Sequence, residues 1–372
     1  MKKISIWLLS IVVLLCVTSC KENNEPEMKK NNYTEKAKDI QLEENEFTSI
    51  VLTTSEKIVY NKIDENGNLK FYVKDIQTNA TRESGNIEGF LICNNSSLLV
   101  DKDLYFFVTV LENEQTRSNV FYRLNIEQCV LEELYREQNM QTFFYLAGSD
   151  ETIYVAKGKL LDETTGYTYI ESYNIKDGTR KEIIEYEIDY KNGEGRIITN
   201  ICLYDEYIYS VEEIVADGIS DYAITVYNEQ GKFEKTIEMS DYKDDVFNTA
   251  ISQIYVNGQY LFITNFMDTT LIGSIEDGEI KKIQLEKNLS IAQNSMPSYK
   301  KPVLYMRESS IFYAFDEEKG KLLKYDISED FESYYISYMA QDNKGGVWMY
   351  LTDENNEEVR KFHYFAKEEF YP

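Results

Sequence analysis

Short runs of alternating apolar and polar residues follow one another along most of the chain. From Phe47 onward, an aromatic and aliphatic run recurs at steps of about 48 residues on average, within the length expected of a four-stranded β-propeller blade. Residues 47–372 therefore hold about seven such units, and six or eight remain open. The runs begin at Ile58, Leu104, Ile153, Ile208, Leu261, Ile311 and Val347.

Each unit repeats the same internal pattern. After the first run comes a polar turn and then a second alternating run that ends in Asn or Asp, as in Lys70–Asp75 and Val120–Asn125. A turn with glycine and a further run follow. Period-2 alternation bounded by Asn, Asp and Gly is typical of antiparallel hairpins, and no helical stripe interrupts it. The pattern predicts an all-β fold, a β-propeller of four-stranded antiparallel blades, closed by a strand near residues 38–42 or after Tyr364.

Two motifs resemble the repeats of a known propeller family. Asp342–Trp348 is similar to the D-x-x-G-x-(V/L/I)-W repeat of NHL-type and two-component-sensor propellers, and Val226–Phe233 is similar to one of their hairpins. The resemblance covers roughly residues 47–372. It implies that Asp342 and the glycine after it build the turn into a blade strand.

The N-terminal residues have the layout of an export signal. Two lysines precede an uncharged apolar stretch over residues 4–19, shorter than the roughly 20 residues of a transmembrane helix. The stretch runs into Val17–Cys20, which resembles the lipobox of bacterial lipoproteins. That resemblance implies a lipoprotein signal peptide over residues 1–19 and a lipidated Cys20. Residues 20–46, polar beyond Cys20, are predicted to form a flexible tether, and an ordinary signal peptide with a chance cysteine is the alternative.

The chain is strongly acidic, with 65 acidic and 39 basic residues and a net charge of -26. Loss of the two lysines in the signal peptide would make it more acidic still. Following a phosphate backbone requires clustered Lys and Arg, so no nucleic acid partner is expected. Because anionic headgroups repel an acidic surface, acyl chains on Cys20 are expected to hold the protein at the membrane.

Few residues are candidates for reactive chemistry. His363 is the single histidine and is interpreted as structural, because it lies in an alternating terminal run. Cys93, Cys129 and Cys202 lie in apolar runs and are interpreted as buried hydrophobes, with one disulfide left open. The turn at Asp64–Asn68 lacks the spacing of a calcium loop. No metal and no cofactor are therefore expected.

Three neighbouring units have long connections after their recurring run, at residues 111–119, 157–168 and 211–221. In propellers, these connections lie on the face that usually binds ligands. Their carboxylates are candidates for an acidic wall facing a cationic partner or a divalent cation, and solvated loops that keep the protein soluble are the alternative. The candidate binding residues are Glu112, Glu114, Arg117, Asp162, Glu163, Tyr167, Glu212, Glu213, Asp217 and Asp221.

The sequence favours a non-catalytic binding or scaffolding module for a protein, peptide or glycan. It is expected to be monomeric, lipid-anchored and extracytoplasmic at a bacterial membrane or cell envelope. Enzymatic activity stays open, because a glycosidase or lyase needs a carboxylate pair in the propeller funnel, one member with a raised pKa. A sensor or accessory subunit of a membrane complex is a further alternative. No catalytic residue is assigned.

Overall fold

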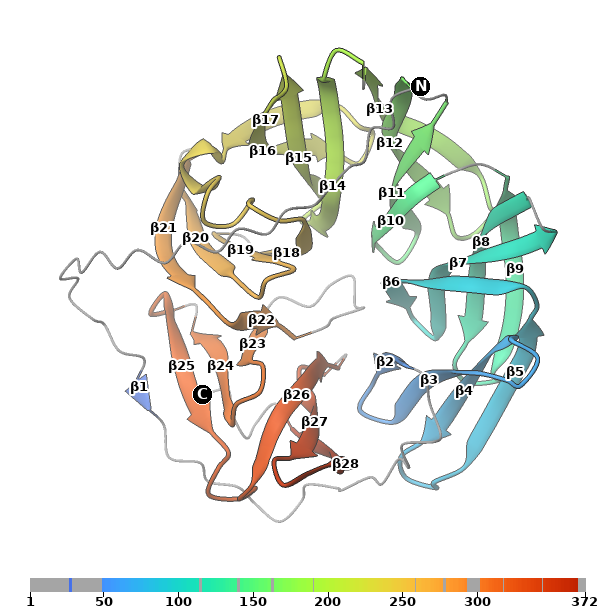
Figure 1. The fold of residues 1–372 in the computed structure, drawn as a ribbon, viewed down its shortest axis with the longest axis vertical. Coiled ribbons are helices and arrows are strands. Elements are labelled where there is room, and N and C mark those ends of the chain that lie inside the picture. The colour runs from blue at the N-terminus through green and yellow to red at the C-terminus, as the bar shows by residue number, and fades with distance from the viewer. Residues whose placement is uncertain are drawn as a thin grey trace, which may run out of the picture.

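The chain folds into a ring of antiparallel β-sheets (Figure 1). The computed structural model describes residues 27–28, 49–113, 116–138, 141–161, 164–189, 191–257, 259–276, 279–292, 302–316, 318–342 and 344–366. Apart from the strand at residues 27–28, which lies at the rim, Figure 1 shows the first strand of each four-stranded unit nearest the centre of the ring and the later strands toward the rim. This arrangement confirms the predicted β-propeller of four-stranded antiparallel blades.

The described strands fall in chain order into seven groups. Group one comprises β2 (Ser49–Thr53), β3 (Lys57–Ile63), β4 (Leu69–Asp75) and β5 (Thr81–Ile87). Group two comprises β6 (Phe90–Val100), β7 (Asp103–Asn113), β8 (Thr116–Asn125) and β9 (Val130–Glu137). Group three comprises β10 (Gln141–Gly148), β11 (Thr152–Leu160), β12 (Thr165–Asn174) and β13 (Arg180–Asp189). Group four comprises β14 (Glu194–Tyr204), β15 (Tyr207–Ala216), β16 (Ile219–Asn228) and β17 (Phe233–Glu238).

The 3-10 helix η2 (Ser240–Tyr242) leads to the remaining groups. Group five comprises β18 (Ile251–Asn257), β19 (Tyr260–Asn265), β20 (Thr270–Glu276) and β21 (Glu279–Glu286). Group six comprises β22 (Leu289–Ile291), β23 (Val303–Met306), β24 (Ile311–Asp316) and β25 (Lys321–Asp326). Group seven comprises β26 (Tyr334–Gln341), β27 (Val347–Asp353) and β28 (Asn356–Phe365). Because this last group has three described strands, the number of blades in the complete ring stays a prediction.

Alternation along each strand builds the core between neighbouring groups. In β7, Leu104 and Phe106 pack against group one, whereas Tyr105 and Phe107 pack against group three. Successive side chains of a strand point to opposite faces of its sheet, so both faces of a blade become buried. Within the described residues, the buried apolar side chains form seven clusters, one between each pair of successive groups and one between group seven and group one.

The motif at Asp342–Trp348 forms the turn between β26 and β27. The buried Asp342 carboxylate accepts hydrogen bonds from the backbone N–H groups of Lys344 and Gly346, both at 2.8 Å, and from the Tyr364 hydroxyl at 2.7 Å. Gly345 has a φ of 86°, which only glycine adopts without strain. Asp342 and Gly345 therefore play the turn-building roles that the resemblance implied.

The same turn joins the two ends of the ring. The indole N–H of the buried Trp348 donates to the backbone carbonyl of Thr54 in group one at 3.0 Å, and Lys344 Nζ lies 3.3 Å from a Glu56 carboxylate oxygen. Residues 38–42 lie outside the described residues. Of the residues after Tyr364, Phe365 ends β28 and packs between groups six and seven, and residues 367–372 are not described, so the prediction that either segment closes the ring stays untested.

One strand assignment from the sequence was wrong. The sequence predicts that Ile311 starts the recurring run of its unit, yet it begins β24, the third strand of group six, and β23 is the second. The second strands of the last three groups begin at residues 260, 303 and 347, which are evenly spaced. Alternation could not distinguish the two strands, because both are short apolar runs.

The N-terminal predictions fall almost entirely outside the described residues. Cys20 and the signal peptide are among those residues, whereas Glu27 and Met28 form β1, which pairs in parallel with β25. The predicted tether thus contributes an edge strand to group six. Across the described ranges, no helix is both long enough and apolar enough to cross a bilayer.

The described thiols and the histidine occupy packed positions. Cys129 and Cys202 form no disulfide, and burial raises the pKa of the Cys129 thiol to about 11 and that of Cys202 further. Cys129 lies in a turn with a φ of 57°, not in a strand as expected. The His363 ring contacts Phe331 and Phe365 with centroid separations of 4.6 and 4.5 Å. The side chain of Cys93 lies outside the description.

Candidate functional site

The antiparallel order of each group places its connections alternately on two faces of the ring. The connections from second to third strand, and from one group to the next, share one face, which we name the hairpin face. The remaining connections share the opposite face, the turn face. Hydrogen bonding agrees with this division: Leu111, in the second-to-third hairpin of group two, donates its N–H to the carbonyl of Gly89 between groups one and two.

The three connections predicted to be long loops are instead extended hairpins. Residues 111–119, 157–168 and 211–221 mostly continue the paired strands, as between β15 and β16, where pairing runs out to Ala216 and Ile219. Only Asp217 and Gly218 form that turn, with φ of 52° and 73°. The second and third strands of groups two to four have nine to eleven residues, against seven in group one. The ring is thus asymmetric as expected, but the asymmetry comes from longer strands in groups two to four and not from longer loops.

The structure separates the predicted binding residues by environment. Glu114, Asp162 and Glu163 lie outside the described residues. Arg117 and Asp217 are exposed, whereas Tyr167, Glu213 and Asp221 are half-buried. Glu212 is fully buried, which corrects its place in a solvent-facing acidic wall.

Glu212 lies in the interface between groups three and four. Its carboxylate accepts hydrogen bonds from the hydroxyls of Thr225 and Tyr227, both at 2.8 Å, and lies 3.1 Å from the Arg196 guanidinium. Burial raises the pKa of Glu212, and these partners only partly offset that rise. Its neighbour Glu213 points to the other face of the sheet and accepts a hydrogen bond from the Ser220 hydroxyl at 2.5 Å.

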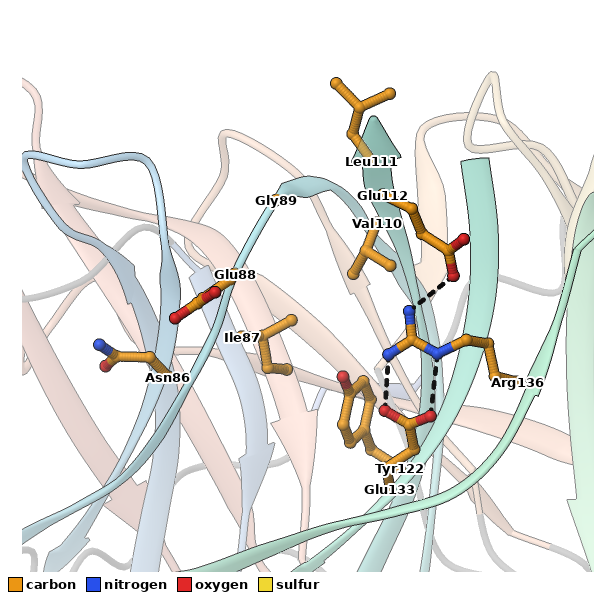
Figure 2. A pocket seen from close by; sticks show the side chains of 10 residues that line it. All are labelled: Asn86, Ile87, Glu88, Gly89, Val110, Leu111, Glu112, Tyr122, Glu133 and Arg136. Atoms are coloured by element: carbon orange, nitrogen blue, oxygen red, sulfur yellow. Dashed lines mark hydrogen bonds and ion pairs between the residues drawn. The ribbon is translucent and has the colours of Figure 1, made fainter. Parts of the chain in front are cut away.

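Glu112 borders an open hollow of about 480 Å³ between groups one and two (Figure 2). Its carboxylate is bound by the Ser118 hydroxyl at 2.6 Å, the Arg136 guanidinium at 2.9 Å and the Gln138 amide at 2.9 Å. These hydrogen bonds lower the pKa of Glu112. Arg136 also grips Glu133 through two nitrogens, at 2.9 and 2.7 Å. The charged side chains of the hollow thus largely satisfy one another.

A second charged cluster, which the sequence did not reveal, lies between groups two and three. The fully buried Lys157 ammonium lies 2.9 Å from Glu171 and 3.1 Å from Glu137. Arg180 binds the same two carboxylates and stacks over the Tyr135 ring at 3.8 Å. Burial alone would raise the pKa of Glu171, but the hydrogen bonds from Arg180 and the charge of Lys157 outweigh it and lower that pKa. The only sequence signal was a lysine directly after the apolar run Ile153–Ala156, at a position within the same alternating strand.

These clusters bear on the enzymatic and metal hypotheses. Glu137 and Glu171 form a carboxylate pair next to an arginine and a tyrosine, but two cations neutralise the pair. Glu212 has the raised pKa of a general acid but is buried away from solvent. Among the described residues, no group of three or more His, Cys, Asp or Glu side chains could hold a metal ion.

Exposed apolar side chains distinguish the hairpin face. Of the eleven large apolar residues exposed in the described part of the chain, eight lie at or next to its connections. These eight are Ile63, Leu91, Ile92, Leu111, Leu161, Ile219, Phe266 and Met267. The other three, Val130, Tyr207 and Phe233, lie next to turn-face connections. The eight on the hairpin face come from groups one to five, and exposed apolar side chains mark an interaction site where they lie close together.

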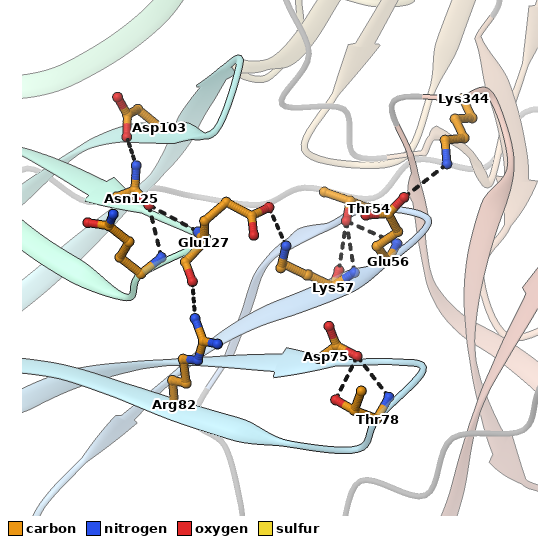
Figure 3. Close-up of polar contacts among 11 residues, drawn as sticks. Thr54, Glu56, Lys57, Asp75, Thr78, Arg82, Asp103, Asn125, Glu127 and Lys344 are labelled. Carbon is orange, nitrogen blue, oxygen red and sulfur yellow. Dashed lines mark hydrogen bonds and ion pairs between the residues drawn. The ribbon is translucent and has the colours of Figure 1, made fainter.

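Polar contacts between groups characterise the turn face (Figure 3). The Glu127 carboxylate binds Lys57 and its backbone carbonyl accepts a hydrogen bond from Arg82, so group two is tied to group one. Lys344 and Glu56 tie group seven to group one. On the same face, several third strands end in an Asn or Asp. The side chain of that residue accepts a hydrogen bond from a backbone N–H of the turn that follows, as at Asp75, Asn125, Asn174 and Asn228.

Comparison with known proteins supports the fold and goes no further. No protein-family model matches the chain, and no curated protein matches it. An oligogalacturonate lyase from Vibrio parahaemolyticus is similar with a TM-score of 0.51 and 11% sequence identity, over 89% of this chain and 96% of that one. An uncharacterized protein from Listeria monocytogenes is similar with a TM-score of 0.51 and 10% identity, over 87% and 96%. At such identities the likeness defines the class of protein, a β-propeller.

Proposed function

We propose that this protein is a lipid-anchored, extracytoplasmic β-propeller that serves as a non-catalytic binding or scaffolding module. Its hairpin face would grip a protein, peptide or glycan, and acyl chains on Cys20 would hold it at a bacterial membrane. One observation carries the proposal: eight of the eleven exposed large apolar side chains in the described residues gather on the hairpin face. Exposing them to water without a partner is unfavourable, and burying them drives association.

The enzymatic alternative receives less support from the same structure. A glycosidase or lyase needs one carboxylic acid with a raised pKa within reach of a second carboxylate and of substrate. The Glu137–Glu171 pair has a lowered pKa at Glu171, and the carboxyl groups whose pKa burial raises, Glu212 and Asp330, lie in other groups of the ring. A binding module requires only an exposed surface, such as the hairpin face.

The test of binding is crosslinking in native cells followed by capture through a C-terminal tag. Phe266→Ser, on the hairpin face, is compared with Phe233→Ser on the turn face, because the two phenylalanines are 62% and 56% exposed, Phe266 in a turn and Phe233 at the start of β17. We expect a partner that the native chain and Phe233→Ser recover and that Phe266→Ser loses. Equal recovery by both variants would overturn the assignment of the face.

The anchor is tested separately by Cys20→Ser. Because lipidation requires the thiol, the variant should leave the membrane fraction and keep its far-ultraviolet circular dichroism. Retention of the variant in the membrane fraction would contradict the proposed anchor without touching the binding face.

A further inference from the structure

The connection over residues 239–250 is bonded to the hairpins of both group four and group five. It is fastened to group four where Met239 donates its N–H to the Tyr222 carbonyl at 3.0 Å and where Lys243 binds the Ser220 carbonyl. It is fastened to group five where Phe266 donates its N–H to the Ala250 carbonyl at 3.0 Å. Three elements distant in sequence are thereby held in one fixed arrangement.

The interior of this connection is packed. Phe247 is buried and stacks on Tyr222 with ring centroids 4.5 Å apart and planes 20° apart. The buried Asn265 donates from its side chain to the Val246 carbonyl at 2.9 Å. A surface built on such contacts loses little conformational entropy when a partner binds, which favours affinity.

Exposed apolar side chains project from both ends of this surface. Ile219 is 66% exposed, Phe266 62% and Met267 68%. Two of the three, Phe266 and Met267, are adjacent in one turn, and aromatic and methionine side chains are enriched where proteins bind one another. We name these three residues together with Asp217, Asp241 and Asp244 the apolar–acidic seat.

The charged residues around the apolar side chains indicate which kind of partner the surface would bind. Asp217, Asp241 and Asp244 are exposed carboxylates. Among the basic residues of this face, Lys243 binds the Ser220 carbonyl and Arg307 lies 3.6 Å from Asp268, while Lys191 and Lys287 are exposed in neighbouring connections. An anionic membrane surface would be repelled here, and so would a second copy of a chain with a net charge of -26. A cationic polypeptide meets no such repulsion.

We infer that the apolar–acidic seat binds a segment of a partner protein in which basic and large apolar side chains alternate. The apolar side chains of that segment would cover Ile219, Phe266 and Met267, and its Lys or Arg side chains would lie beside Asp217, Asp241 and Asp244. The inference rests on the proposed function and narrows its ligand to one chemical class. Electrostatic complementarity would set the rate of encounter and the choice of partner, and apolar burial would supply the affinity.

The experiment measures binding of three synthetic peptides of equal length to the purified full chain by fluorescence anisotropy. One peptide combines Lys with Leu, one Lys with Ser, and one Glu with Leu. We expect binding of the Lys–Leu peptide alone, with an affinity that falls as salt screens the carboxylates. Comparable binding of the Lys–Ser peptide would show that apolar side chains are not needed. Binding of the Glu–Leu peptide would show that basic side chains are not needed, and either result would overturn the inference.

Matched variants locate the binding. Phe266→Ser with Met267→Ser should weaken the affinity for the Lys–Leu peptide at least tenfold, because the change removes two apolar side chains that the peptide would bury. Asp241→Asn with Asp244→Asn should weaken it about threefold to tenfold. Asp205→Asn with Glu206→Gln makes the same change of net charge at an exposed turn on the opposite face and should leave affinity unchanged. Equal weakening by both charge variants would show a nonspecific effect and overturn the seat.

The outcomes separate this inference from the proposed function. If no peptide binds, yet capture in cells still depends on Phe266, the partner class is wrong and the binding face stands. If neither peptide binding nor capture depends on Phe266, both are wrong. If the full chain binds neutral phosphatidylcholine vesicles through Phe266 and Met267 and binds no peptide, the seat contacts a membrane and the inference is overturned.

Discussion

The two faces of this propeller are built from the same hairpins and expose different chemistry. On the turn face, short Asx turns alternate with polar ties between groups, such as Lys57 to Glu127. On the hairpin face, groups two to four extend their strands, and large apolar side chains meet solvent. Both faces carry exposed carboxylates, so charge alone does not tell them apart. The apolar side chains do.

We expect the two faces to contribute differently, the turn face to the stability of the ring and the hairpin face to binding. The turn face contains contacts that close the ring, because Trp348 and Lys344 reach group one there. The hairpin face contains side chains such as Phe266 and Met267 whose exposure adds nothing to folding. We therefore expect substitutions at the two faces to have opposite profiles, one lowering the free energy of unfolding and the other lowering binding.

The largest expected effect is on ring closure. Trp348→Ala removes a fully buried indole and should lower the free energy of unfolding by about 3–5 kcal/mol, measured by urea denaturation. Trp348→Phe keeps most of the ring but loses the hydrogen bond to the Thr54 carbonyl, so it should be intermediate. If Trp348→Ala unfolded at the same urea concentration as the native chain, the closing role assigned to this turn would be wrong.

A second test measures how the free energy of unfolding depends on pH, and it distinguishes the buried carboxylates from those on the hairpin face. The pKa of Glu171 is lowered, so it stabilises the fold above about pH 4.5 and that stability is lost as pH falls through its folded pKa. The pKa of Glu212 is raised, so stability is lost as pH rises from about 4.5 through its folded pKa. The two groups thus act with opposite sign.

Glu171→Gln should flatten the acid side of the stability–pH curve, and Glu212→Gln should flatten the fall above about pH 4.5. A single proton changes the slope by at most about 1.4 kcal/mol per pH unit. The charge variant Asp241→Asn with Asp244→Asn serves as the control and should leave the curve unchanged. A curve altered more by the control than by Glu212→Gln would mean that the surface carboxylates, and not the buried ones, govern stability.

The smallest expected effect is the most direct check on the comparison. Phe266→Ser and Phe233→Ser should each change the free energy of unfolding by no more than about 0.5 kcal/mol, because both side chains are mostly exposed. Thermal denaturation of the two variants side by side measures this. A loss of several kcal/mol in Phe266→Ser would make that residue part of the core and would remove the reason to call its surroundings a binding surface.

The sequence came close to the fold because a propeller repeats one local pattern. Period-2 alternation, Asn or Asp at strand ends and the Asp342–Trp348 turn each need only neighbouring residues to form, so they are legible one hairpin at a time. The misplaced second strand of group six shows the limit of that reading. Two short apolar runs look alike until their neighbours in the sheet are known.

The candidate site was predicted less well, and the pair Glu212 and Glu213 shows why. Alternation sends the two side chains to opposite faces of one sheet, but in a propeller each face packs against another group. No period in the sequence distinguishes a position facing a neighbour from one facing solvent. The buried Lys157 was missed for the same reason, since its partner Glu137 lies in the preceding group.

The sequence by itself determined the strand pattern, the turns and the acidic charge, because each follows from residue type and near neighbours. Only the tertiary structure decided which carboxylates are buried, how the last group meets the first and which face exposes apolar side chains. Those features depend on how one group packs on the next. The hairpin tips of groups four and five are held together by hydrogen bonds and packing contacts of the connection over residues 239–250, and these contacts form only in the folded ring.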